Sequence, residues 1–512
     1  MSTFHVENFG CRATQADGAA IERQFEERGL SRTAAEKADI VVLNTCTVTA
    51  SADQDARAAI RRIHRHNPQS RILVTGCYAQ RAPEELACLP GVAQVVGNSH
   101  KYRLADIALN CHSSGAQSNS GFVPLSALEP GSSDAGDAWI FVSDIFAHAE
   151  LLPAAVFDAA NERTRPNLKV QDGCDNRCSF CVIPYVRGQS RSLRLQDVVA
   201  QVNALVDEGY REVVISGINL GRWGRDLARA AASSLVAGSR LPVLGENSPA
   251  TENRERRTNN CLEGLVRTIL ERTALEKLRI SSVEAMDWTN ALIRLMAESP
   301  RIAKHAHVPM QSGSDRILRA MHRKYRPWHY REKIENIRAV MPTAAIGADV
   351  MVGFPGETDS DFEETRRMVA DLPFTYLHVF TYSPRPGTPA ARLGNQVPIA
   401  IARQRNRILR ELASEKKREF MRSFVGRELD AITLHGFEDG STEALTDNYL
   451  KLRLAGRHGA NQWIRVRIEQ VVEDGMLLGS PQVGPITGEL RTETEPLICD
   501  TRRSRRSQVR GL

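Results

Sequence analysis

Apolar runs that read as strands alternate with helical segments through the first hundred residues. Three of these runs, FHVENFGC, DIVVLNTC and RILVTGC, each end on a cysteine, namely Cys11, Cys46 and Cys77. The segments 15–28 and 53–65 between them have helical periodicity, and a fourth run, VAQVVGN, closes the set near residue 98. Repeated strand–helix units predict an open parallel α/β sheet over residues 1–111.

The three cysteines are expected to meet at one edge of this sheet. Ligands of open parallel sheets bind beyond the carboxyl ends of the strands, where Cys11, Cys46 and Cys77 stand. We therefore interpret them as ligands of one shared metal site. The alternative is that each is a small buried residue packed at a strand end.

A second strand–helix series begins at residue 166, after a polar interruption. Residues 112–137 contain seven Ser and four Gly, which is typical of a flexible linker, and the chain up to residue 165 leads into the next domain. The strand-like runs that follow are LKVQDGC, REVVISGIN, KLRISSVEA, HAHVPMQSG, IGADVMVGFPGE and TYLHVFTYSP, and helical segments among them are 195–208, 290–298, 315–322, 328–340 and 360–370. Six parallel βα units predict an incomplete (βα)6 barrel over residues 166–400, with chemistry at the carboxyl ends of its strands. Residues 225–260 lack stable periodicity and are interpreted as an insertion.

The C-terminal region predicts a small antiparallel β-barrel behind a helix. Residues 401–424 form a basic connecting helix. The runs ELDAITLHGF, YLKLRLAG and WIRVRIEQVVEDGMLLG then alternate apolar with polar residues around glycine-containing turns, which indicates a barrel over residues 425–485. Residues 486–512 form an arginine-rich tail.

Composition and charge indicate where the protein is located and what kind of partner it binds. No apolar run approaches the roughly 18 residues of a membrane helix, and the first residues lack the pattern of a signal peptide, so we expect a cytoplasmic protein with no membrane partner. The net charge of +6 is concentrated toward the C-terminus: residues 403–422 hold eight Lys or Arg and three Glu, and residues 501–512 hold five Arg and no acid. This basic end suits a polyanion such as RNA; the alternative is a solvated helix face and tail.

A second cysteine group has the spacing of a cluster-binding loop. The segment GCDNRCSFC places Cys174, Cys178 and Cys181 directly after a predicted strand. Three thiolates on one short loop can hold three irons of a 4Fe-4S cluster and leave the fourth iron open to a ligand. Structural zinc is the competing interpretation, but it usually takes four protein ligands, and no second pair of cysteines with suitable spacing accompanies this loop. We interpret the three as catalytic cluster ligands.

Several motifs, in a fixed order, carry a family resemblance. They are NTCTVT, TGCYAQ, GCDNRCSFCVIPYVRG, ISSVEA, HVPMQSGSDRILRAMHRKY, DVMVGFPGET and YSPRPGTPA. In these motifs the chain resembles the radical S-adenosylmethionine methylthiotransferases over nearly its whole length. The resemblance implies an N-terminal methylthiotransferase domain with an auxiliary 4Fe-4S cluster on Cys11, Cys46 and Cys77, a radical domain with a second 4Fe-4S cluster, and a C-terminal TRAM barrel that binds RNA.

The resemblance also implies contacts to the cofactor S-adenosylmethionine. An aromatic residue within the cysteine loop would lie beside the adenine, while strand ends and a tight glycine turn would hold the rest. The residues at these positions are Phe180, Ser216, Gly217, Glu284, Gln311, Gly353, Pro355 and Gly356. Beside Gln311, Ser312 and Ser314 are further candidates, whereas His305 and His307 are interpreted as structural. Arg187 and Arg191 would contact phosphate or the cofactor, or else solvent.

Members of this family differ in their target. One class modifies N6-threonylcarbamoyladenosine next to the tRNA anticodon, a second modifies N6-isopentenyladenosine there, and a third modifies an aspartate of a ribosomal protein. The motifs NFGCRATQ, VVGNSHK and RGQSRS are most similar to the first class. The resemblance therefore implies a tRNA methylthiotransferase that acts at carbon two of N6-threonylcarbamoyladenosine, with an electron donor such as flavodoxin or ferredoxin as a partner. Thr14 and Arg177 depart from the family pattern, which bears on the class and not on the cluster ligands.

Overall fold

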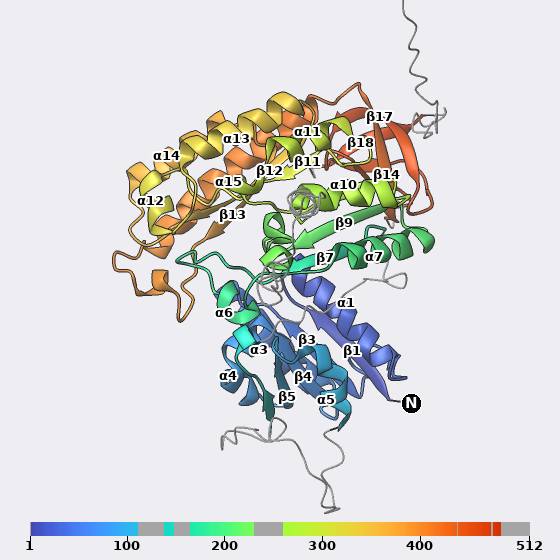
Figure 1. Ribbon diagram of the computed structural model, residues 1–512, viewed down its shortest axis with the longest axis vertical. Coiled ribbons are helices and arrows are strands. Elements are labelled where there is room, and N and C mark those ends of the chain that lie inside the picture. Colours follow the sequence, from blue (N-terminus) through green and yellow to red (C-terminus); the bar gives the residue numbers. More distant parts are fainter. Residues whose placement is uncertain are drawn as a thin grey trace, which may run out of the picture.

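The computed structural model describes residues 2–110, 138–147, 164–229, 260–437, 439–472 and 475–482. An N-terminal α/β sheet, a central half-barrel and a C-terminal β-barrel follow one another along the chain (Figure 1). The predicted linker at 112–137, most of the predicted insertion at 225–260 and the predicted tail at 486–512 lie outside the described residues.

The N-terminal sheet is open and parallel, as predicted, and has the strand order β2-β1-β3-β4-β5-β6. Its strands are β1 (Thr3–Asn8), β2 (Ser31–Arg32), β3 (Ile40–Thr45), β4 (Arg71–Gly76), β5 (Val92–Gly97) and β6 (Trp139–Phe141). The prediction that the run near residue 98 closes the set is wrong, because β6 pairs in parallel with β5 from beyond the linker. A strand of three residues is too short to show a period of two in the sequence.

Helices cover both faces of this sheet. They are α1 (Arg12–Glu26), α2 (Ala50–His66), α3 (Cys77–Arg81), α4 (Pro83–Ala87) and α5 (Leu104–Asn110), with the short η1 (Lys101–Arg103) before α5. Alternate residues of β3 enter two different apolar clusters: Ile40 and Val42 pack with Phe25 of α1, whereas Val41 and Leu43 pack with Ile60 of α2. Every residue of β3 is therefore buried, which explains why its sequence is apolar without alternation.

The central domain contains the six predicted parallel strands. They are β7 (Asn167–Asp172), β9 (Glu212–Gly217), β10 (Lys277–Ile280), β11 (His305–His307), β12 (Ala345–Val352) and β13 (Tyr376–Thr381), and the two-residue β8 (Arg191–Ser192) pairs antiparallel with β7. Hydrogen bonding divides them into two sheets, β10-β9-β7-β8 and β11-β12-β13, which are joined by a bridge between Leu278 and Ile302 and by a hydrogen bond from the Val283 N–H to the His307 carbonyl. In the described part of the chain the outer strands β8 and β13 do not pair with each other, so the barrel is incomplete.

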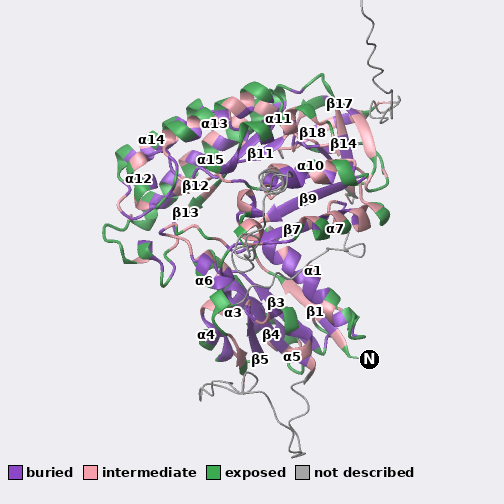
Figure 2. Cartoon of the chain, viewed as in Figure 1, coloured by how far each residue is buried: buried purple, intermediate pink, exposed green. Residues whose placement is uncertain are grey.

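Helices pack on the outer face of the half-barrel. Those that contribute to the outer apolar core are α7 (Leu195–Asp207), α10 (Leu262–Arg272), α11 (Asn290–Glu298), α12 (Asp315–Ala320), α13 (Pro327–Val340) and α14 (Asp359–Asp371). By contrast, α6 (Ile183–Arg187) packs against α3 of the N-terminal domain. The short turns are η3 (Ile145–Ala147), η4 (Leu220–Arg222), η5 (Ala285–Asp287) and η6 (Pro389–Arg392). Figure 2 shows β9 buried beneath the outer helices and the outer faces of α13 and α14 exposed. Thr358 and Asp361 form a reciprocal capping box that fixes the start of α14.

The C-terminal barrel is closed and small, as predicted. After the basic helix α15 (Ile399–Arg422) come β14 (Glu428–Gly436), β15 (Thr442–Thr446), β16 (Lys451–Leu454), β17 (Trp463–Val471) and β18 (Leu477–Pro481), in the barrel order β14-β15-β16-β18-β17. The expectation of a wholly antiparallel barrel needs one correction, because β16 and β18 pair in parallel to close it. No helix in the described part of the chain is long and apolar enough to cross a membrane.

Candidate functional site

The N-terminal cysteines lie at neighbouring strand ends. Cys11 precedes α1, Cys46 follows β3 and Cys77 begins α3 directly after β4. Gly10 has a φ of +104°, and a Cβ there would lie 2.5 Å from the Cβ of Cys46, so the chain before Cys11 passes directly over Cys46. Burial raises the pKa of the Cys46 thiol to about 12, and the nearby thiols of Cys77 and Cys11 add to the rise. The structure therefore brings the three thiols together.

The second cysteine group occupies the loop between β7 and α6. A backbone hydrogen bond of 3.1 Å from the Cys181 N–H to the Cys178 carbonyl holds the turn of this loop. Burial, together with the nearby Cys178 and Cys174, raises the pKa of the Cys181 thiol to about 12. These thiols also share one site. A raised pKa keeps a free thiol protonated at neutral pH, but a bound metal ion deprotonates a coordinating thiol outright. These thiols are therefore better suited to binding a metal than to reacting as free thiolates.

Polar groups donate to the sulfur atoms of this loop. The Sγ of Cys174 accepts from the backbone N–H of Asn176 at 3.4 Å and from Nδ2 of Asn219 at 3.6 Å. The Sγ of Cys178 accepts from Nη1 of Arg323 at 3.4 Å, and the same guanidinium is ion-paired with Glu284. Hydrogen bonds to sulfur are one of the means by which a protein sets the potential of an iron–sulfur cluster.

A buried ionic network joins the two cysteine sites. Arg187 donates from Nε to the Sγ of Cys77 at 3.2 Å, from Nη2 to Asp17 at 2.9 Å and from Nη1 to both oxygens of Asp172 at 3.0 Å. Asp172 stands two residues before Cys174, so one guanidinium links the N-terminal cysteines to the start of the cysteine loop. Lys169 is ion-paired with both carboxylates, and Lys101 donates to Asp17 at 3.0 Å.

The charges of this network are not balanced. Two carboxylates and three cations share the buried space, so the cations are in excess. Buried charges are costly unless they are paired, and Arg187, one of these cations, donates to the Sγ of Cys77. Against burial, which lowers it, Asp172, Cys77 and Asp17 raise the pKa of Arg187 well above its usual value. An anionic iron–sulfur cluster fits the N-terminal site, because three thiols converge there, Arg187 donates to one of them and the surrounding charge is positive. A second cluster fits the cysteine loop, where three thiols accept hydrogen bonds from N–H donors.

The expected cofactor residues near β9 and β10 surround the cysteine loop. Ser216 is the last residue but one of β9, and its buried Oγ has no hydrogen-bond partner among the described residues, as expected of a group that binds a ligand. Gly217 follows, and a Cβ there would lie 2.8 Å from the side-chain oxygen of Gln171, so its small size serves packing as well. Glu284 and Arg323 line a small hollow that also includes Cys178.

Past the end of β11, Gln311 differs from the two serines that follow it. Its backbone has a φ of +63°, a strained conformation for a residue other than glycine, of the kind that gathers at functional sites. Ser312 lies at 3.2 Å from the Thr365 hydroxyl, and Ser314 donates to Asp361 at 2.7 Å. The two serines therefore hold α14 in place, and Gln311 is the member of this group with an unusual backbone.

The remaining predicted residues have packing partners. Gly353 and Gly356 have φ values of +76° and +80° in the turn after β12, and Pro355 between them is buried. A Cβ on Gly353 would lie 2.6 Å from Ala402 of α15. Phe180 packs on an apolar cluster made of Ile317, Met321, Phe354, Tyr382 and Ala390. Arg191 donates to the Arg187 carbonyl at 2.8 Å.

Sequence reasoning missed several residues of the site. Arg323, Asn219 and Asp172 contact the cysteine loop or its neighbours, and Asp17 and Lys101 reach Arg187 or its partners from the N-terminal domain. A buried lysine that follows a strand–cysteine repeat has no sequence signal of its own. Arg323 and Asp172, however, stand inside the motifs AMHRKY and QDGC. A charged residue within a motif of the resemblance is the sequence signal that could have identified them.

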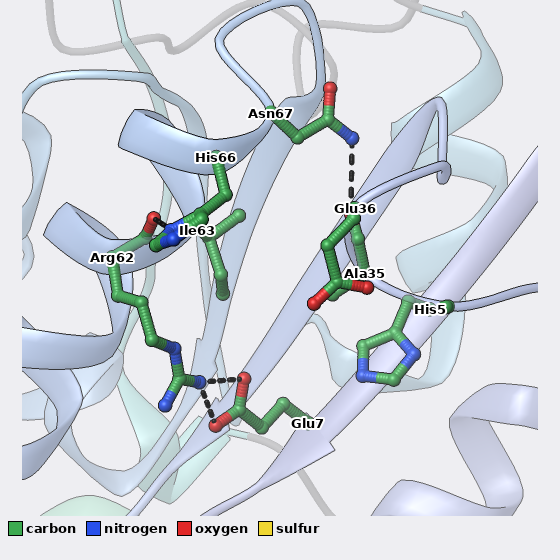
Figure 3. A pocket seen from close by; sticks show the side chains of 9 residues that line it. His5, Glu7, Ala35, Glu36, Arg62, Ile63, His66 and Asn67 are labelled. Atoms are coloured by element: carbon green, nitrogen blue, oxygen red, sulfur yellow. Dashed lines mark hydrogen bonds and ion pairs between the residues drawn. The ribbon is translucent and has the colours of Figure 1, made fainter.

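A larger pocket, of about 390 Å³, lies elsewhere on the N-terminal domain (Figure 3). It is lined by residues of β1 and α2 and of the turn near residue 35, and Arg62 is ion-paired with Glu7 at 2.7 Å across it. None of its lining residues is a cysteine or belongs to the central domain. This pocket is therefore separate from the cysteine sites.

Comparisons with known proteins agree with this arrangement. Two family models match: Uncharacterized protein family UPF0004 over residues 3–97 and the Radical SAM superfamily over residues 168–369. The chain is 35% identical to the threonylcarbamoyladenosine tRNA methylthiotransferase MtaB of Aquifex aeolicus, over 90% of this chain and 99% of the relative. It is 31% identical to the tRNA-2-methylthio-N(6)-dimethylallyladenosine synthase of Thermobifida fusca, over 92% and 84% of the two chains. The fold is similar to that of the radical S-adenosylmethionine methyltransferase TsrM of Kitasatospora setae, with a TM-score of 0.50 and 15% identity over 76% of this chain and 77% of that one.

Proposed function

The chain belongs to the MtaB-like radical S-adenosylmethionine methylthiotransferases, and from this premise we propose that it adds a methylthio group to carbon two of N6-threonylcarbamoyladenosine in tRNA. Membership of the family makes it a tRNA methylthiotransferase that uses a 4Fe-4S cluster and S-adenosylmethionine. The choice of base rests on the identity to the MtaB relative, which extends over nearly all of both chains. Action on tRNA implies a cytoplasmic protein.

The pairing of two three-cysteine sites is the observation that carries the proposal. Sulfur insertion needs one site that activates a C–H bond and another that holds sulfur within bonding reach of the activated carbon. Cys174, Cys178 and Cys181 would hold the cluster that binds S-adenosylmethionine, and Cys11, Cys46 and Cys77 would hold a second 4Fe-4S cluster. Arg187 contacts Cys77 and Asp172 together, which supports a fixed arrangement of the two sites.

The roles of the surrounding residues follow from their contacts. Bound at the cysteine loop, the cluster and S-adenosylmethionine would supply the one-electron chemistry that breaks a C–H bond. Ser216 offers an unpaired hydroxyl to a ligand, and Glu284, held by Arg323, offers a carboxylate to a cationic or hydroxyl group. Cys174, Cys178 and Cys181 are half-buried, so the cysteine loop remains accessible to a ligand.

The basic helix α15 and the C-terminal barrel are the proposed tRNA contacts. Arg403, Arg407 and Arg410 are exposed and lie at helical spacing on α15. Met421 near the end of the same helix and Phe424 just after it pack in the barrel core, so helix and barrel form one continuous surface for a phosphate backbone. A reductant such as flavodoxin or ferredoxin completes the set of proposed partners.

Nucleoside analysis tests the proposed substrate. Anaerobically reconstituted protein is incubated with S-adenosylmethionine, a reductant and tRNA that lacks methylthio groups, and the digested nucleosides are separated by liquid chromatography with mass detection. We expect the 2-methylthio derivative of N6-threonylcarbamoyladenosine, and none from a variant with Cys174, Cys178 and Cys181 changed to Ala. Methylthiolation of N6-isopentenyladenosine instead, the reaction named for the Thermobifida fusca relative, or of a ribosomal-protein aspartate, would contradict the proposed substrate.

A further inference from the structure

Two histidines and an aspartate lie together on the inner face of the half-barrel. His307 stands on β11, Asp349 on β12 and His378 on β13, with Asp349 directly paired with His378 in the strand register. The alternate residues Ala348 and Val350 enter the outer apolar core with α13 and α14, so Asp349 projects from the opposite face. One ligand atom from each of the three residues lies within 4.8 Å of the others.

The separations of these atoms match those around a tetrahedral metal ion. Nε2 of His307 lies 3.4 Å from Oδ1 of Asp349, and Nδ1 of His378 lies 3.2 Å from the same oxygen. Zinc binds imidazole nitrogen and carboxylate oxygen at about 2.0–2.1 Å, and tetrahedral ligands at that radius are about 3.3 Å apart. The three side chains therefore need little movement to enclose one ion.

His307 is oriented as metal-binding histidines usually are. Its Nδ1 lies 2.7 Å from the hydroxyl of Ser282, which leaves Nε2 directed at Asp349. Metal-ligating histidines commonly make such a bond with their second ring nitrogen, which fixes the ring and its tautomer. The side chain of His307 is only 7% exposed, and its Nε2 has Oδ1 of Asp349 as a polar neighbour at 3.4 Å. A metal ion held between these two atoms would replace this long contact with two ligand bonds.

The triad is open on one side. The exposed fraction of the side chain rises from 7% in His307 through 24% in Asp349 to 56% in His378. Three protein ligands with one accessible side are typical of a site that keeps a position for water or a ligand oxygen, as opposed to a closed structural site. We propose that His307, Asp349 and His378 bind one Zn²⁺ ion and that its fourth position is open to water or an oxygen ligand. This site is independent of the proposed substrate.

Zinc binding to the cluster-loaded protein tests the proposal. Full-length holoprotein is equilibrated anaerobically with buffered Zn²⁺, freed of unbound metal and analysed for zinc and iron by mass spectrometry. We expect one zinc per chain with the iron content unchanged. The exposed ligand variant His378→Asn should lose this zinc, and Ser282→Ala should weaken its binding by about 10–100-fold. His329→Asn, at an exposed histidine of α13, is the matched control and should bind zinc as the native protein does.

X-ray absorption at the zinc edge identifies the ligands. A shell of nitrogen and oxygen at about 2.0–2.1 Å supports the triad, whereas sulfur at about 2.3 Å would mean that zinc has entered a cysteine site and would overturn the proposal. Equal zinc content in the native protein and His378→Asn, or no bound zinc in the native protein, would overturn it as well. Because His378 is more than half exposed, its substitution leaves the core intact and the comparison remains interpretable.

Discussion

Arg187 contacts Cys77 of one cysteine site and Asp172, which stands two residues before the other, and its chemistry can be tested by a change that keeps its charge. Arg187→Lys retains a cation near Asp17 and Asp172 but removes the Nε–H donor to Cys77. Loss of a hydrogen bond to a ligand thiolate destabilises the reduced cluster, and such a bond is worth about 1.5–3 kcal/mol. We therefore expect the midpoint potential of the cluster on Cys11, Cys46 and Cys77 to fall by tens of millivolts. Redox titration followed by electron paramagnetic resonance measures it.

The reciprocal variant serves as the control. Arg323→Lys removes the donor to Cys178 and should shift the potential of the other cluster instead. A potential that stays unchanged in Arg187→Lys, in a protein that carries both clusters, would show that the Arg187–Cys77 contact does not tune the cluster. A protein that holds a single cluster would contradict the two-cluster proposal itself.

Asp17 gives a prediction for stability and its pH dependence. Burial raises the pKa of Asp17, but Lys101, Lys169 and Arg187 lower it by more, so that it lies well below the usual 3.8. Asp17→Asn removes one of the two carboxylates that balance three buried cations, leaving only Asp172 to pair with Lys169 and Arg187, and should lower the free energy of unfolding by about 3–5 kcal/mol at pH 7. Because the folded-state pKa is depressed, the contribution of Asp17 is complete above the usual pKa and is lost as the pH falls through the folded-state value.

Urea unfolding of native protein and variant across pH measures this effect. The difference between the two proteins should be constant from pH 7 down to about 5 and should shrink in stronger acid. Asp106→Asn is the control, because Asp106 pairs with Arg28 on the surface, where both side chains are about a third exposed, and should cost about 0–1 kcal/mol. Equal effects of the two substitutions would argue against the buried network.

At the scale of single elements, α15 separates its basic residues by role. Arg405 is buried and donates to Glu357 at 2.6 Å and to Asp359 at 2.7 Å, so it fastens the helix to the start of α14. Arg403, Arg407 and Arg410 face solvent on the same helix. The basic character of α15 in the sequence is therefore partly structural, and only its exposed face is available to a polyanion.

Charge reversal on that face tests tRNA binding without disturbing the fold. A variant with Arg403, Arg407 and Arg410 changed to Glu should bind tRNA more weakly, and the slope of log affinity against log salt should be reduced by roughly 0.9 for each lost phosphate contact. Filter binding across a salt series measures both quantities. Truncation after residue 424 is a poorer test, because it exposes Met421 and Phe424, which pack in the barrel core. Unchanged affinity and slope would exclude this face from the tRNA contact.

For the whole molecule, the two cysteine sites should be separable in function. We expect a variant with Cys11, Cys46 and Cys77 changed to Ala to retain reductive cleavage of S-adenosylmethionine while it forms no methylthio product, because Cys174, Cys178 and Cys181 alone provide an open iron. Iron content, 5′-deoxyadenosine yield and modified nucleoside are measured on one folded sample. The native protein should hold about eight irons and the variant about four. Unchanged iron together with continued product would refute a cluster on the N-terminal cysteines.

The sequence by itself determined the local elements and the order of the domains. The strand–helix series and the CxxxCxxC loop are set by residues close in the chain, and the N-terminal sheet, the six central strands and the small barrel follow from them. A period of two or 3.6 residues is a local property, so it can be found without the fold. The same pattern could not show β6 or the parallel pairing of β16 with β18, because these depend on which free edge a short strand meets.

Only the tertiary structure decided which charged side chains join the cysteines. Arg187 contacts Cys77 although the two are 110 residues apart in the chain. Near the proposed zinc site, His305 likewise contacts Tyr376, which is 71 residues away. A buried ion pair leaves no periodic trace in the sequence, since each partner alone looks like an ordinary surface charge. His307 accordingly appears structural in the sequence, and it becomes a candidate ligand only when β12 and β13 place Asp349 and His378 beside it.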